Sequence, residues 1–134
     1  KNLKWITPSN KNPQTETEEI KKSISFINQS RSNMMVITNY SFFSALTNKK
    51  LFSPMRWFIM NGNSHPLPKN KYYKNYKKFL VNKITKYNID EIVTIGIDHD
   101  NYIENLLSEN CDITKNKYNL SLISHLVKNC DIVE

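Results

Sequence analysis

Two short apolar runs constrain the fold of this chain more than any other feature. Residues 34–38 read Met-Met-Val-Ile-Thr and follow a polar stretch, and residues 91–97 read Glu-Ile-Val-Thr-Ile-Gly-Ile. Unbroken apolar runs of this length are typical of strands that are buried on both faces. The sequence therefore predicts at least two central strands.

The segment between the two runs predicts a helix over residues 71–87. Its expected apolar stripe comprises Tyr72, Tyr76, Phe79, Leu80, Ile84 and Tyr87. A strand, a helix and a strand in succession predict a right-handed crossover between parallel strands. We therefore expect residues 34–38 and 92–97 to lie side by side in one parallel sheet.

The rest of the chain predicts more helices than strands. Isoleucines at positions 20, 24 and 27 predict a helix over 16–29, with Thr15 and Glu18 as a capping box. A helix is also predicted over 100–109, and a short strand over 111–113. Apolar residues at helical spacing between 120 and 127 predict a last helix, although the serines between them leave a strand open.

This alternation of helices and buried strands indicates an α/β fold. We expect a small three-layer sandwich, in which helices flank a short, mainly parallel sheet of three to four strands. A length of 134 residues suits one domain, which we assign to residues 15–134, with residues 1–14 as a linker or arm. Because the sequence begins at Lys1 rather than Met, we expect a piece of a longer protein.

Charge is distributed unevenly along the chain. Residues 1–19 carry three Lys and three Glu, residues 20–89 carry thirteen Lys or Arg and no acid, and residues 90–134 carry nine acids and three Lys. These parts contribute 0, +13 and −6 to the formal charge of +7. Such asymmetry indicates a basic surface for the phosphates of anionic lipid or nucleic acid. Compositional drift is the alternative, since seventeen of the nineteen cations are Lys.

The long loop after the first strand holds several candidate ligand-binding residues. Residues 48–70 have weak periodicity, and a loop of that length in a compact domain is usually functional. Arg56 and Trp57 could together stack on and hydrogen-bond a sugar or a base; alternatively, Trp57 anchors the loop with Arg56 over its ring. His65 is either a ligand-binding residue or a structural hydrogen-bond donor.

The carboxyl ends of the two strands provide the other candidates, because ligands of open α/β sheets bind there. Asn39, Tyr40 and Ser41 follow the first strand, and Asp98 and His99 follow the second. The latter pair, with Asp100, could supply an acid and a base, or could cap the next helix.

The sequence lacks the motifs that are typical of nucleotide-binding sites and of metal sites. Gly62 and Gly96 are the only glycines, too few for the glycine-rich loops that bind dinucleotides or nucleoside phosphates. The three histidines lack metal-ligand spacing. We therefore expect no metal and no cofactor.

Cys111 and Cys130 stand 19 positions apart, and each precedes Asp-Ile. They could lie on neighbouring short strands and form a disulfide, which would indicate an oxidising compartment. Two buried thiols are the alternative.

Four segments resemble a region of known membrane proteins: residues 36–43, Ser-Pro-Met-Arg-Trp at 53–57, His65-Pro66, and the helix over 72–79. Together they are similar to the soluble C-terminal region of bacterial polytopic membrane proteins related to the GT-C class of lipid-phosphosugar-dependent glycosyltransferases. The resemblance covers about residues 15–130. It implies an extracytoplasmic domain beside a membrane domain of the same polypeptide that carries the catalytic acid, and no catalytic residue transfers to this segment.

We therefore expect a noncatalytic accessory domain that binds a glycan or a lipid-phosphosugar and lies against anionic lipid headgroups. Two alternatives stay open, and both would also permit a cytoplasmic location. One is a free-standing nucleic-acid binder, less favoured, in which Tyr73 is the exposed tyrosine of the long helix. The other is a small α/β enzyme that uses Asp98 and His99.

Overall fold

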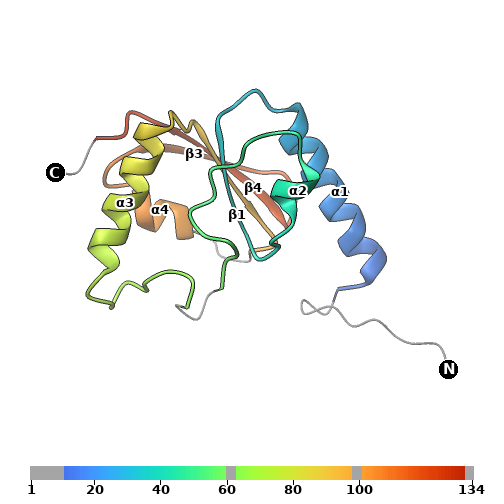
Figure 1. Cartoon of the computed structure of the whole chain (residues 1–134), viewed down its shortest axis with the longest axis horizontal. Helices are drawn as coiled ribbons and strands as arrows, with labels where there is room; N and C mark the ends of the chain where they lie inside the picture. The colour runs from blue at the N-terminus through green and yellow to red at the C-terminus, as the bar shows by residue number, and fades with distance from the viewer. Residues whose placement is uncertain (1–10, 60–62, 98–100, 132–134) are drawn as a thin grey trace.

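The computed structural model of the chain describes residues 11–59, 63–97 and 101–131. The helices are α1 (Pro13–Gln29), α2 (Phe43–Leu46), α3 (Tyr73–Lys86) and α4 (Tyr102–Leu107). The strands are β1 (Met34–Thr38), β2 (Glu91–Ile95), β3 (Asp112–Lys117) and β4 (Leu122–Lys128). They form one open sheet in the order β1-β2-β4-β3, with helices on either side of it (Figure 1).

The two central runs pair as predicted. β1 and β2 are parallel, with Met34 opposite Glu91 and Thr38 opposite Ile95. Every residue of both strands is buried, so neither strand shows the alternation of polar and apolar side chains that a half-exposed strand would have. The crossover between them contains α2, the long loop and α3. The expected meeting of the two carboxyl ends at one edge of the sheet is therefore confirmed.

The sheet as a whole is mixed, so the prediction of a mainly parallel sheet is wrong. β4 is antiparallel to β2, and β3 is antiparallel to β4. The predicted last helix over 120–127 is wrong too, because β4 occupies this stretch. Its position between two strands buries residues of both faces, including Ser124 and His125, and this burial removes the alternation that would identify a strand.

Apolar residues from the two faces of the sheet form two separate clusters. In one cluster Ile27 of α1 and Phe43 of α2 contact Met34, Val36 and Val93. In the other, residues of α3 and α4 contact alternate strand residues such as Met35, Ile37 and Ile92; the helical residues are Leu80, Val81, Ile84, Ile103, Leu106 and Leu107. Figure 1 shows α1 and α2 on one side of the sheet and α3 and α4 on the other.

Helix α1 begins earlier than the predicted capping box requires. Asn12 is the cap, its side-chain oxygen accepts the amide of Gln14 at 2.9 Å, and Pro13 occupies the first turn. The Lys11 ammonium lies 2.7 Å from Glu19 and 3.1 Å from the Ser121 hydroxyl. The last residues of the predicted linker therefore belong to the folded unit.

Helix α3 is rotated relative to the stripe predicted for it. Tyr73 and Tyr76 pack against the core together with Leu80 and its neighbours, whereas Tyr72 and Phe79 are 57% and 47% exposed. Tyr73, predicted to be free, is partly buried. The shift leaves large aromatic rings on the outer face of α3.

The outer edge of β1 is covered by the long loop. The amides of Phe52 and Phe58 donate to the carbonyls of Met34 and Thr38, at 3.0 and 2.7 Å. This cover protects an edge that could otherwise pair with another strand.

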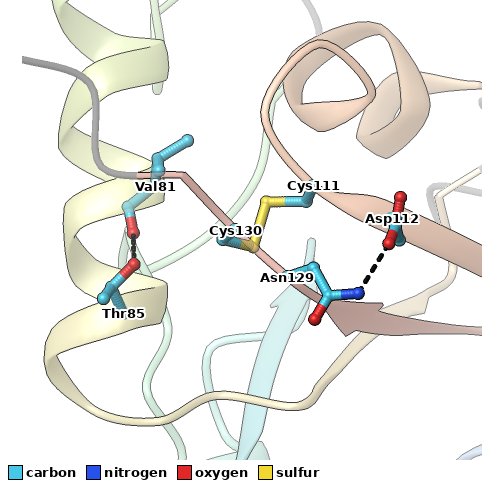
Figure 2. Close-up of a disulfide and its surroundings, with 6 residues drawn as sticks. All are labelled: Val81, Thr85, Cys111, Asp112, Asn129 and Cys130. Atoms are coloured by element: carbon cyan, nitrogen blue, oxygen red, sulfur yellow. Dashed lines mark hydrogen bonds between the residues drawn. A yellow bond between two sulfur atoms is a disulfide. The ribbon is translucent and has the colours of Figure 1, made fainter.

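Cys111 and Cys130 form a disulfide across the open end of the β3–β4 hairpin (Figure 2). Asn129, whose φ is 50°, turns the chain just before Cys130, and its side-chain amide donates to Asp112 at 2.8 Å. Cys111 belongs to the core cluster that also contains Val81 of α3, and Cys130, which is partly buried, packs against this cluster. The bridge therefore joins the edge strand β3 to the core.

Among the described residues, we find no helix whose length and hydropathy would allow it to cross a bilayer.

Candidate ligand-binding groove

The carboxyl ends of β1 and β2 meet at Gly96. This residue has a φ of +68°, and a Cβ placed there would lie 2.9 Å from the Asn39 Oδ1 and 3.0 Å from a ring carbon of Tyr40. Both the left-handed backbone and the close approach require glycine. Gly96 therefore fixes how the segments that follow the two strands sit against each other.

Tyr40 is held from the opposite side by α1. Its hydroxyl donates to the carboxylate of Glu16. Burial raises the pKa of Tyr40 well above its usual value, and the bond to Glu16 raises it further. The phenol is therefore a neutral group that shapes the surface at the strand end and stays protonated near neutral pH.

Beside Tyr40 lies a hollow of about 430 Å³ between β1, α2 and the long loop. Its polar lining consists mainly of hydroxyl groups and one guanidinium, contributed by Thr38, Tyr40, Ser41, Ser44, Ser53 and Arg56. Val36, Phe43, Leu51 and Met55 complete it. Small donors and acceptors around one cation suit a hydroxyl-rich molecule with a negative group.

A second hollow, of about 490 Å³, continues along the loop. It is lined by Met55, Arg56, Trp57, Ile59, Asn63 and Ser64. Since Met55 and Arg56 line both hollows, we describe the two as one groove.

Arg56 and Trp57 are both exposed at the middle of this groove. The Arg56 Cζ lies 6.0 Å from the centroid of the Trp57 ring, and Trp57 is 45% exposed. Phe58, which is 3% exposed, is the residue that anchors the loop. The guanidinium and the indole face are therefore accessible to a ligand.

His65 lies below the groove, among aromatic rings. It is 6% exposed, stacks on Phe58 with ring centroids 4.7 Å apart, and meets Tyr102 edge-on at 5.2 Å. Its Nδ1 lies 3.0 Å from the Ser64 hydroxyl. His65 is thus buried among aromatic rings, and the groove linings above do not include it.

The candidates divide into three groups. Tyr40, Arg56 and Trp57 come together along the groove, Asn39 lies against Gly96 at the strand ends, and His65 is buried. Asp98 and His99 lie outside the described residues. The groove thus brings together three of the seven residues that the sequence proposed for ligand binding.

The sequence reasoning named Ser41 beside Asn39 and Tyr40 at the end of the first strand, but it did not single out Ser44 or Ser53 as ligand-binding residues. Ser41 and Ser44 are three positions apart around the short helix α2, and Ser53 comes from the loop. Ser41 and Ser44 come shortly after a buried strand, a position that serines in ordinary turns share, and Ser53 lacks even that signal.

A partly buried polar cluster on the other side of the sheet was also missed. The His125 Nε2 lies 3.5 Å from the Glu104 carboxylate, which is also 3.1 Å from the Lys115 ammonium. Burial lowers the pKa of His125 below its usual value, despite the nearby carboxylate. The cluster ties α4 to β3 and β4.

We compared the chain with models of protein families, with curated proteins and with solved structures, and found no match.

Proposed function

We propose that this chain is a noncatalytic accessory domain of a larger, membrane-bound glycosyltransferase-like protein, and that its groove binds a glycan or a lipid-phosphosugar. The proposal includes an extracytoplasmic location and the three-layer arrangement that the two apolar clusters support. The observation that carries it is the groove itself, where hydroxyl groups, one guanidinium and one open indole face converge.

The chemistry of the lining favours a sugar with an anionic group. Arg56 can form paired hydrogen bonds to phosphate or carboxylate. An exposed indole suits the apolar face of a sugar ring, and serine hydroxyls can both donate to and accept from sugar hydroxyls. The lining residues of the groove include no carboxylate that would repel such a ligand.

The proposal is tested by titrating the isotope-labelled chain with a hexose 1-phosphate, the free hexose and inorganic phosphate, followed by NMR. We expect shifts at Ser41, Ser44, Ser53 and the Trp57 indole, strongest with the hexose phosphate. Arg56→Gln should weaken binding of the hexose phosphate by about 10- to 100-fold, because a charge-assisted contact is lost.

The chain provides a matched control, since Arg31 is its only other arginine and is exposed outside the groove. Arg31→Gln should leave the affinity unchanged. Shifts that avoid the groove, or equal losses in the two arginine variants, would refute the assignment. The chain alone should also leave a lipid-linked sugar donor intact in a transferase assay.

A further inference from the structure

Lysines and aromatic rings alternate along the outer face of α3 and the adjoining loop. Four ammonium groups lie over neighbouring rings, at 5.1 Å for Lys50 and Phe52, 4.9 Å for Lys71 and Tyr72, 5.8 Å for Lys83 and Phe79, and 5.5 Å for Lys86 and Tyr87. Phe52 and Tyr87 stack with centroids 4.8 Å apart, which joins the loop to the end of α3. We call these eight residues the lysine–aromatic ridge.

Six of the eight residues of the ridge are exposed, Phe52 and Lys83 are half-buried, and the ridge is strongly basic. Tyr72 and Phe79 are about half exposed, and a shallow hollow of about 230 Å³ lies between Phe79, Asn82, Lys83, Lys86 and Tyr87. The whole segment 20–89, which contains the ridge, lacks acidic residues. Lys77, by contrast, pairs with Glu109 at 2.6 Å on the flank of α3 that faces α4.

We propose that the lysine–aromatic ridge docks this domain on the surface of an anionic phospholipid bilayer. Lysine ammonium groups attract the phosphates of the headgroups, and lysine stems can lie along apolar surface while their charges stay in water. Tyrosine and phenylalanine rings suit the boundary between headgroups and acyl chains. The positive charge of the ridge and its exposed rings are thus both complementary to the surface of an anionic bilayer.

Single-stranded nucleic acid also binds surfaces with lysines and aromatic rings, but one observation favours the bilayer. The disulfide between Cys111 and Cys130 belongs to an oxidising compartment, where nucleic acid is not the usual anion.

Docking through the ridge would hold the groove close to the membrane. The Lys83 ammonium donates to the carbonyl of Ser53 at 3.0 Å, and Ser53 lines the groove. A membrane-linked ligand would then meet the groove near the headgroups. The inference itself does not depend on the groove, because vesicle binding and sugar binding are measured separately.

The test is sedimentation of the chain with vesicles of phosphatidylcholine alone, or mixed equally with phosphatidylglycerol, at low and high salt. We expect binding only to the anionic vesicles and a loss of binding at high salt. Each lysine near the surface contributes about a fivefold change in partitioning. The triple variant Lys50→Gln, Lys71→Gln, Lys86→Gln should therefore bind on the order of 100-fold more weakly.

A charge-matched control separates the ridge from net charge. Lys21→Gln, Lys22→Gln, Lys117→Gln removes three exposed lysines from α1 and β3, and its binding should fall far less. All six side chains are exposed, so both variants should keep the circular dichroism spectrum of the parent. The variant Phe79→Ser should also weaken vesicle binding several-fold.

Three results would overturn the inference: no binding to the anionic vesicles, equal losses in the two triple variants, or tighter binding to an oligothymidylate than to vesicles. The ridge variant should keep the affinity of the parent for hexose 1-phosphate. A failure of the ridge is therefore distinguishable from a failure of the groove.

Discussion

Replacement of Cys111 and Cys130 by alanine is expected to lower the free energy of unfolding by about 3 kcal/mol. The disulfide spans a sequence separation of 19. Closing a loop of that length removes about 11 cal/mol/K of chain entropy from the unfolded state, which is about 3 kcal/mol at 25 °C. With roughly 2.1 cal/mol/K of unfolding entropy per residue, the 134 residues should show a fall in Tm of about 11 °C.

The assay is thermal and urea unfolding followed by circular dichroism, with and without a reducing agent. Reduction should lower the Tm of the parent to about that of the double variant, and the variant itself should not respond. The single variant Cys111→Ala should match the double variant, because either change opens the ring. If reduction leaves the Tm of the parent unchanged, the reasoning fails; a free-thiol assay would then show whether the bridge had formed.

Three further perturbations test other parts of the fold by urea unfolding. Gly96→Ala should cost about 1–2 kcal/mol, because a φ of +68° strains any side chain; a loss below 0.5 kcal/mol would contradict this. Ser124→Ala should cost about 1–3 kcal/mol, because its buried hydroxyl donates to the buried Glu91 carboxylate at 2.6 Å; no change would show that the bond is dispensable. Stability should fall as the pH drops from 7 to 4. Burial lowers the folded pKa of His125, and the pKa of Glu104 is also lowered, since hydrogen bonds and nearby cations outweigh its burial. The unfolded state therefore binds more protons over this range. His125→Gln should flatten the upper part of the profile, and a flat profile in the parent would refute the assignment.

The central pair of strands could be predicted because strands that are buried on both faces have continuous apolar runs in the sequence. Residues 34–37 are apolar without a break, so no other element suited them, and the helix between the two runs determined their parallel direction. Burial on both faces also made β4 difficult to recognise as a strand from the sequence. Its residues from Leu122 to His125 and Val127 are buried, so their spacing resembled that of a helix more than the alternation of a half-exposed strand.

The groove could be predicted only in part, for a related reason. Arg56 and Trp57 stood out because a cation beside a large ring is uncommon in a loop. Ser44 and Ser53 did not stand out, because the sequence around a serine in a loop does not show whether a hollow lies beside it. The rotation of α3 also depends on which of two adjacent tyrosines meets the core, and Tyr72 and Tyr73 have identical side chains.

The loop that carries Arg56 both covers the edge of β1 and forms part of the groove, and these two roles are linked. The segment from Phe52 to Phe58 is hydrogen-bonded to β1 and also forms one wall of the groove. A molecule bound in the groove would hold this segment down, so hydrogen exchange at the Phe52 and Phe58 amides should slow although neither residue lines the groove. When the segment lifts, the carbonyls of Met34 and Thr38 are uncovered, and two copies of the chain could join there edge to edge. Occupancy of the groove would in this way also guard the domain against self-association.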